Sequence, residues 1–173
     1  MRDVYHGRIV HLRLEDVELP NGAKITLEVV RHSGAAAIVA VDDERQVVLI
    51  RQFRHAAGGF IWEIPAGRLE KDEPPLDCAQ RELEEETGLR ADAWKRLGEV
   101  ITAPGFCDER IQIFLATGLR ETAQRLEPDE VLSVSRVPLR QALRMIESGE
   151  ISDGKSVAGL HHAWIHFSGL PES

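Results

Sequence analysis

The alternation of apolar and polar positions at the start of the chain predicts antiparallel strands. Two alternating runs, residues 9–19 and 24–31, flank a polar turn that contains Asn21-Gly22. This dipeptide is a strong signal for a tight hairpin, so we expect the two runs to pair with each other. Residues 1–35 are therefore interpreted as a small N-terminal antiparallel β segment with little hydrophobic core of its own.

From residue 36 onward, the pattern predicts one larger domain, residues 36–173. Apolar positions recur at helical spacing over residues 139–148 and 154–167. Strands and helices interleave without regular alternation, which favours the α+β class, as an α/β/α sandwich with a mixed β-sheet between helices. The predicted strands are residues 36–41, 47–53, 60–64, 94–101, 110–116 and 131–137.

A third helix is predicted within the acidic segment that runs from Gly67 to Leu89. Pro74-Pro75 supplies a helix start, and Gly88 supplies a stop. This segment has a higher density of carboxylates than a solvent-exposed helix face requires. We therefore consider both a functional and a structural interpretation of its glutamates.

Glu82 and Glu86 stand four residues apart and project from one face of this helix, with Glu85 beside them. Like charges at this spacing repel each other, so a bound cation would explain the arrangement. Oxygen ligands favour a hard ion such as Mg²⁺, which usually shares its remaining coordination sites with water and substrate phosphates. The structural alternative is a solvated acidic face of an amphipathic helix.

Composition and charge limit the classes of molecule that the chain is expected to bind. The formal net charge is -8, with 43% hydrophobic and 29% charged residues, which is ordinary for a globular protein. An acidic chain disfavours binding to polynucleotides, so we expect no nucleic-acid partner. Small phosphorylated substrates are still compatible, because a bound metal reverses the local charge.

Cysteine usage and hydropathy predict a cytoplasmic protein. Cys78 and Cys107 are far apart and lack a paired ligand spacing, so neither a disulfide framework nor a zinc site is indicated. No secretion signal and no apolar run long enough to span a bilayer is seen, so we expect no membrane partner.

The acidic segment resembles the Nudix box, G-x5-E-x7-R-E-U-x-E-E-x-G-U, where U is an aliphatic residue. Residues 28–35, 51–67 and 104–109 are also similar to the ADP-ribose and ADP-sugar pyrophosphatase branch of that family, so the resemblance covers nearly the whole chain. The matching box residues are Gly67, Glu73, Arg81, Glu82, Leu83, Glu85, Glu86, Gly88 and Leu89.

This resemblance implies a Nudix fold and a Mg²⁺-dependent hydrolase that cleaves the diphosphate of ADP-ribose to AMP and ribose 5-phosphate. The nucleophile is expected to be water, because no Ser or Cys nucleophile lies near a His in the sequence. Two or three Mg²⁺ ions, or Mn²⁺ in their place, would assist it. The alternatives are another nucleotide sugar (GDP-mannose, an ADP-hexose or UDP-glucose) or a non-catalytic module that senses a nucleotide.

The resemblance also assigns roles to box residues. Glu82 and Glu86 would be the main metal ligands, together with the carbonyl group of Ala66. Glu85 would be either a further ligand or a support. Glu73 and Arg81 would form an ion pair that orients the helix from behind the ligands.

Residues 126–131 are expected to supply a further carboxylate. Glu130 matches the family's metal-binding position in this loop, and it can also act as the base. The position two residues earlier is Pro128, where relatives are often acidic, so Glu127 or a box glutamate such as Glu85 are alternative bases. The structural alternative for Glu127, Asp129 and Glu130 is a solvated turn.

Substrate recognition is predicted outside the box. Arg54 and Arg51 would contact the diphosphate, because guanidinium groups match phosphate oxygens. Glu28 matches a position that reads the adenine amino group in some relatives. Pro104 and Gly105 match a loop typical of this branch. Exposed strand arginines and an ordinary Pro-Gly turn are the structural alternatives.

Two features bear on base recognition and assembly. Leu27 occupies the place of an aromatic platform in some relatives, which departs from the pattern for stacking on the base. In this branch, N-terminal strands commonly exchange between two subunits, so the resemblance implies a homodimer. A β segment of about 35 residues with little core fits that arrangement, because isolated hairpins are marginal in water.

Overall fold

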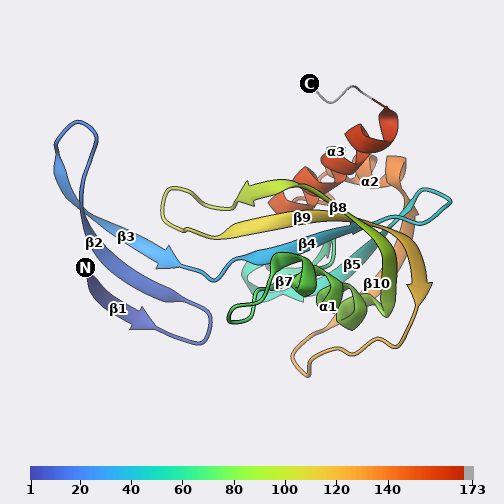
Figure 1. Cartoon of the computed structure of the whole chain (residues 1–173), viewed down its shortest axis with the longest axis horizontal. Coiled ribbons are helices and arrows are strands. Elements are labelled where there is room, and N and C mark those ends of the chain that lie inside the picture. The colour runs from blue at the N-terminus through green and yellow to red at the C-terminus, as the bar shows by residue number, and fades with distance from the viewer. Residues whose placement is uncertain (170–173) are drawn as a thin grey trace.

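The N-terminal segment forms a separate three-stranded antiparallel sheet. A computed structural model describes residues 1–169 of the chain. The strands β1 (Arg2–His6), β2 (His11–Glu18) and β3 (Lys24–Arg31) lie in the order β1-β2-β3. The predicted hairpin at Asn21-Gly22 is confirmed, and Gly22 has the positive φ of 83° that this turn requires. Figure 1 shows this sheet standing away from the rest of the molecule.

Residues 35–138 provide two further sheets. The first contains β4 (Ala35–Ala40), β7 (Ala66–Arg68), β8 (Leu89–Ile101) and β9 (Arg110–Glu121), in the order β7-β4-β9-β8. Its β4 and β9 are parallel, and its other pairs are antiparallel. The second sheet, in the order β10-β5-β6, is antiparallel. It contains β5 (Gln46–Arg54), β6 (Gly59–Glu63) and β10 (Leu132–Pro138). The 3-10 turn η1 (His55–Ala57) connects β5 to β6.

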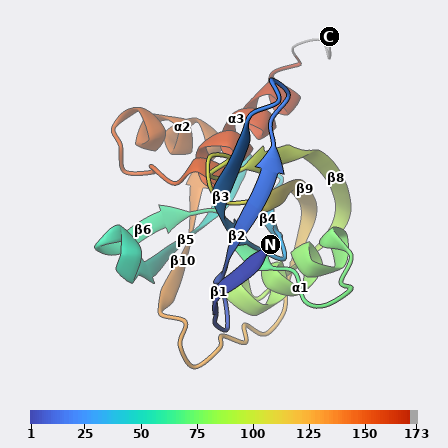
Figure 2. The ribbon, with the colours of Figure 1, turned by 90° about the vertical axis from the view of Figure 1, so that its left-hand side faces the viewer.

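Helices cover both faces of these sheets. Figure 2 shows α1 (Pro75–Thr87) on one side, and α2 (Leu139–Glu147) with α3 (Gly154–Ser168) on the other. The strand β4 is buried along its whole length because alternate side chains enter two different cores, one shared with α1 and one shared with α2 and α3. The predicted α+β sandwich is therefore confirmed.

The largest differences from the predicted elements lie in strands that face solvent. The strand β8 begins at Leu89, where residue 94 was expected, and β9 continues to Glu121, where residue 116 was expected. The short strands β1 and β7 were not predicted. Such segments are held by backbone pairing with a neighbour, so their side chains carry little hydrophobic signal. No helix in residues 1–169 is long and apolar enough to cross a bilayer.

The N-terminal sheet is attached to the larger body through the loop between β8 and β9. Arg31 donates from Nη1 to Asp108 (2.8 Å) in this loop, and from Nη2 to Glu15 (2.6 Å) within the sheet. The backbone N–H of Val30 donates to the Phe106 carbonyl at 2.7 Å. A division at residue 35 stays a prediction, but it coincides with the start of β4.

Candidate active site

A cavity of about 740 Å³ lies beside α1 and borders most of the predicted catalytic residues. Its walls come from α1, from β5 and β7, from the loop between β9 and β10, and from the start of α3, and also from the N-terminal segment and the ends of β8 and β9. The structure therefore brings together residues that are distant in the sequence. The predicted residues on its walls are Arg54, Ala66, Arg81, Glu82, Glu85, Glu86, Glu127 and Glu130.

Two box carboxylates at this cavity are deeply buried. Glu86 is 1% exposed, and its Oε2 accepts a hydrogen bond from the Ala66 N–H at 2.9 Å. Burial, together with the nearby Glu82 and Glu130 carboxylates, raises the pKa of Glu86 to about 8. Burial likewise raises the pKa of Glu82 to about 7, although Arg81 opposes the shift. In the absence of a cation, these two carboxyl groups therefore ionise less readily than exposed glutamates.

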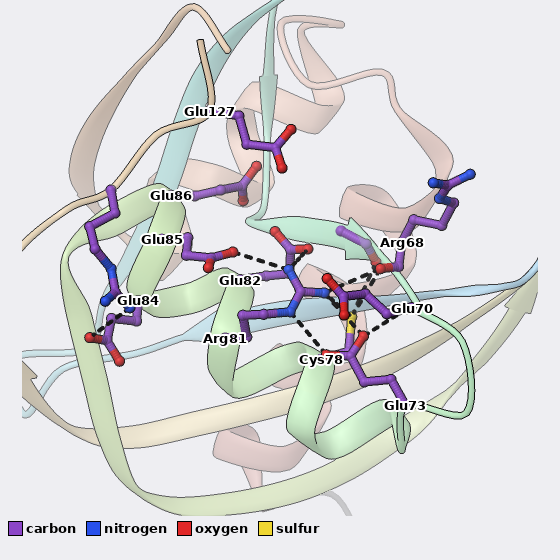
Figure 3. A network of polar contacts seen from close by, with 12 residues as sticks. Arg68, Glu70, Glu73, Cys78, Arg81, Glu82, Glu84, Glu85, Glu86 and Glu127 are labelled. Atoms are coloured by element: carbon purple, nitrogen blue, oxygen red, sulfur yellow. Dashed lines mark hydrogen bonds and ion pairs between the residues drawn. The ribbon is translucent and has the colours of Figure 1, made fainter. Parts of the chain in front are cut away.

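Arg81 organises the carboxylates on this side of α1 (Figure 3). It donates two hydrogen bonds to Glu73, at 2.9 and 3.1 Å, which forms the expected ion pair. Its Nη1 donates to Glu82 at 2.6 Å and to Glu85 at 3.0 Å. Glu73 also accepts from the Glu70 N–H at 2.8 Å, so it fixes the loop before α1 as well as the guanidinium.

Gly67 is needed where the chain passes Glu82. A Cβ at this position would lie 1.9 Å from the Glu82 Cδ, far closer than two non-bonded carbons approach. The absence of a side chain therefore lets the carboxylate occupy its place beside β7. This explains in physical terms why the box motif specifies a glycine here.

The donor set fits a hard divalent ion. Within residues 1–169, no three acidic, histidine or cysteine side chains already converge on one point. Arg81 instead donates hydrogen bonds to oxygens of both Glu82 and Glu85. The oxygens of Glu82 and Glu86 at the cavity are nevertheless the kind of ligands that Mg²⁺ prefers, and Gly67 leaves room for the Glu82 carboxylate.

The loop between β9 and β10 carries Glu127 and Glu130 to the same cavity. Glu130 accepts from the Glu127 N–H at 2.8 Å, so the two carboxylates belong to one turn. The Glu130 charge helps to raise the pKa values of both Glu82 and Glu86, which places it within electrostatic reach of them. Figure 3 shows Glu127 on the Glu86 side of the carboxylate group, away from Glu73.

The two predicted diphosphate arginines lie on opposite faces of β5. Arg54 borders the cavity, and its Nε donates to the buried Glu63 at 2.8 Å. Arg51 is exposed and lies over the Phe60 ring, 5.5 Å from its centroid, and it does not border the cavity. One strand alternates its side chains between two faces, so only one residue of the pair reaches the site.

Three other predicted substrate residues also lie away from this chain's cavity. Glu28 is exposed on β3, and Pro104 and Gly105 are exposed in the loop between β8 and β9. Thr102 and Glu109, at the two ends of that loop, do border the cavity. The predicted segment is therefore adjacent to the site, although different residues of it face the open space.

Several cavity residues were missed by the sequence interpretation. His32 and Glu109 form an ion-pair contact of 3.3 Å, and Lys155 lies in the first turn of α3. Gln52 could have been found from the two-residue period of β5, because it shares the face of Arg54. Lys155 has no comparable signal, since the fold alone brings it across the molecule to β6.

Known proteins resemble this chain over most of its length. The NUDIX domain family matches residues 30–160. An ADP-ribose pyrophosphatase of Bacillus subtilis (strain 168) is 42% identical, covering 92% of this chain and 87% of that protein. An ADP-ribose pyrophosphatase of Mycobacterium tuberculosis (strain ATCC 25618 / H37Rv) is 43% identical, covering 91% and 77% respectively.

Two further similarities concern substrate range and fold. A GDP-mannose pyrophosphatase of Citrobacter koseri (strain ATCC BAA-895 / CDC 4225-83 / SGSC4696) is 39% identical, covering 81% of this chain and 76% of that protein. The crystal structure of an ADP compounds hydrolase superposes with a TM-score of 0.82 at 23% identity, covering 97% of this chain and 92% of that one. At that identity, the structural likeness bears on the fold alone.

Proposed function

Because this chain belongs to the NUDIX family, we propose that it hydrolyses the diphosphate of ADP-ribose to AMP and ribose 5-phosphate. The observation that carries the proposal is the cavity in which the buried Glu82 and Glu86 share walls with Arg54. Carboxylates suited to metal ions and a guanidinium suited to phosphate are the two kinds of group that diphosphate hydrolysis requires. The names of two relatives support ADP-ribose as the substrate.

Enzymes of this family generally depend on divalent metal ions, and we infer Mg²⁺ here, with Mn²⁺ as an alternative ion. Glu82, Glu86, Glu85 and Glu130 would hold two or three ions, together with the Ala66 carbonyl group. Bound there, the ions would neutralise the diphosphate and lower the pKa of the attacking water. Glu73 would support this arrangement by fixing Arg81 behind the ligands.

The protein's own groups would complete the reaction. The water oxygen forms a bond to one phosphorus, the bridging P–O bond breaks, and a carboxylate accepts the proton from water. Glu127, Glu130 and Glu85 are the candidates for this base, since all three border the cavity. To identify the base, each candidate is changed to Gln and the pH profile of kcat is measured. We expect the profile to lose its acidic limb only when the base is changed.

Glu86→Gln tests the proposed function most directly, with Glu84→Gln as its matched control. Glu86 is buried at the cavity, whereas Glu84 points away from it on the same helix and pairs with Arg90 and Arg125. We expect Glu86→Gln to reduce turnover of ADP-ribose with Mg²⁺ at least about 100-fold, and Glu84→Gln to change it by less than about threefold. Equal activities of the two variants would contradict the proposal.

A substrate panel separates ADP-ribose from the alternatives. ADP-ribose, GDP-mannose, ADP-glucose and UDP-glucose are compared at fixed Mg²⁺, and products are identified after reaction in ¹⁸O-water. A preference for GDP-mannose of about 100-fold or more, equivalent to nearly 3 kcal/mol, would replace ADP-ribose as the substrate. Specific binding of a nucleotide without turnover would instead indicate a sensing module.

We also propose a homodimer in which residues 1–35 pack against the second subunit. The N-terminal sheet exposes apolar side chains that no element of residues 1–169 covers, among them Val4 (52% exposed) and Tyr5 (59% exposed). Packing of this sheet against the second subunit would place Glu28 beside that subunit's cavity, which would give it the predicted role in base recognition. The cytoplasmic location stays a prediction.

A further inference from the structure

An ion cluster around the buried Glu63 joins three elements at the wall of the cavity. Glu63, which ends β6, is 4% exposed and accepts hydrogen bonds from two cations. Arg54 donates to it from Nε at 2.8 Å, and Lys155 donates from Nζ at 2.6 Å. Lys155 Nζ also lies 3.1 Å from Asp153 Oδ1. One carboxylate thus fixes two basic groups that are far apart in the sequence.

Both cations keep donors that the cluster does not use. The contact with Glu63 engages only Nε of Arg54, and among residues 1–169 its two terminal nitrogens have no hydrogen-bond partner, so both can form a bidentate contact with an anion. Lys155 has three N–H donors and two carboxylate partners. Because Arg54 and Lys155 both border the cavity, these remaining donors are placed where a substrate would lie.

Anchoring of α3 does not require Lys155. The Ile64 N–H, at the end of β6, already donates to the buried Ser156 hydroxyl at 2.8 Å. Asp153 caps the helix by accepting from the Ser156 N–H at 3.1 Å. The start of α3 is therefore fixed to β6 by other groups as well, and the ion pairs with Glu63 and Asp153 hold the Lys155 ammonium beside the open cavity.

Gln52 supplies a second, independent observation at the same wall. It precedes Arg54 by two residues, faces the same side of β5, and borders the cavity although it is 5% exposed. Its Oε1 has no hydrogen-bond partner among the described residues. Buried polar atoms are nearly always paired, so this amide oxygen is available to accept a hydrogen bond from a hydroxyl group bound in the cavity.

Two chemically different groups of residues contribute to the lining of the cavity. One group, from the N-terminal segment and the ends of β8 and β9, includes the apolar side chains of Ile9 and Ile101 and the ring of His32, with polar residues beside them (Arg8, Thr102 and Glu109). The other group, from β5 and the start of α3, is polar. Its residues are Gln52, Arg54, Asp153, Gly154 and Lys155.

We propose that Gln52, Arg54 and Lys155 form a subsite for the sugar-phosphate half of the substrate, with Glu63 as the residue that positions both cations. This inference rests on the proposed function, and it specifies which half of the diphosphate compound each group of lining residues holds. Phosphate oxygens can accept from Arg54 and Lys155, and sugar hydroxyls can donate to the Gln52 amide oxygen and the Asp153 carboxylate, whereas a planar base matches the Ile9 and Ile101 side chains.

Product inhibition by ribose 5-phosphate and by AMP distinguishes the two halves. We expect Lys155→Met to raise the inhibition constant of ribose 5-phosphate about 10- to 100-fold, because it removes a charge-assisted hydrogen bond. The KM for ADP-ribose should rise in parallel, the inhibition constant of AMP should change less than about twofold, and Lys155→Arg should restore part of the loss. Lys71→Met, at an exposed lysine outside the cavity, should change none of these values.

Two outcomes would overturn the subsite. Lys155→Met could weaken AMP as much as or more than ribose 5-phosphate, or it could leave both unchanged. If that variant does not fold, Gln52→Met decides by the same comparison, since it removes the amide at similar size. If the wild-type protein does not turn over ADP-ribose, the proposed function is contradicted instead. Calorimetric titration with AMP and with ribose 5-phosphate would still test the subsite in that case.

Discussion

At the scale of single residues, the lack of a side chain at Gly67 makes room for the carboxylate of Glu82. A Cβ at residue 67 would lie 1.9 Å from the Cδ atom of Glu82, so the carboxylate fills the space that a side chain there would need. Any side chain at this position would displace the carboxylate from its place against β7. The geometry of the ligand is therefore fixed by the backbone of another element, as well as by α1 itself.

Gly67→Ala should weaken metal binding while the fold survives. The added methyl group forces the Glu82 carboxylate to move, and loss of an oriented ligand typically costs about 10- to 100-fold in metal affinity or activity. Titration calorimetry with Mn²⁺ measures the change. Gly105→Ala is the control, because a Cβ there would meet no atom within 4 Å. Unchanged Mn²⁺ affinity in Gly67→Ala would contradict the prediction.

The two arginines of β5 should differ strongly in their effect on catalysis. Arg54 borders the cavity, and Arg51 lies on the opposite face over Phe60. We expect Arg54→Ala to lower kcat/KM for ADP-ribose about 100-fold, which corresponds to nearly 3 kcal/mol of lost phosphate contact. Arg51→Ala, measured in the same steady-state assay, should stay within about threefold. An equal loss in both variants would show that Arg51 contacts the substrate after all.

At the scale of elements, α1 concentrates negative charge in a buried place. The pKa of Glu82 is raised to about 7 and that of Glu86 to about 8, from the ordinary value of 4.5, mainly because burial disfavours the charged form. Between about pH 4.5 and 8, the folded protein therefore binds more protons than the unfolded chain. Its free energy of unfolding falls as pH rises through this window.

Metal-free protein should consequently be less stable at pH 8.5 than at pH 6. Thermal unfolding in the presence of a chelator measures this difference, and excess Mg²⁺ should raise the Tm most at pH 8.5, where the ligands are ionised. Glu86→Gln is the control, because the variant lacks one of the two titrating groups and should lose part of the pH dependence. A Tm that rises with pH in the metal-free wild type would contradict the prediction.

Sequence patterns predicted the elements that have their own local signals. The helix α1 begins at Pro75 and ends before Gly88 as expected, because proline and glycine act through local backbone geometry. By contrast, the first five residues of β8 were missed, since they are held by pairing with β9 and mostly face solvent. Local signals thus define helices and buried strands better than exposed strands.

The same distinction applies to the site. The box carboxylates share one helix face, so spacing alone predicted that Glu82 and Glu86 would lie together. The contact of Lys155 with Glu63 joins residues that are 92 positions apart, and only the packing of α3 on β6 creates it. A sequence pattern can assign the catalytic metal ligands, but the residues that read the rest of the substrate depend on tertiary structure.

At the scale of the whole molecule, the N-terminal sheet is an extension without a core. Its β1 is exposed along its entire length, and Val4 and Tyr5 on that strand present apolar surface to solvent. Three strands that bury little hydrophobic area are marginally stable by themselves. Pairing with a second subunit would cover this surface, which is the physical argument for the proposed homodimer.

Tyr5→Asp should therefore shift the protein toward the monomer. A charge at this exposed apolar position is tolerated in water but disfavoured in a buried interface, where it would lack a partner. Light scattering coupled to size exclusion, at about micromolar concentration, should give twice the chain mass for the wild type and a lower mass for the variant. Ile165→Asp is the matched control, because Ile165 is 47% exposed on α3, far along the chain from the sheet. A monomeric wild type, or equal masses for all three proteins, would rule out this interface.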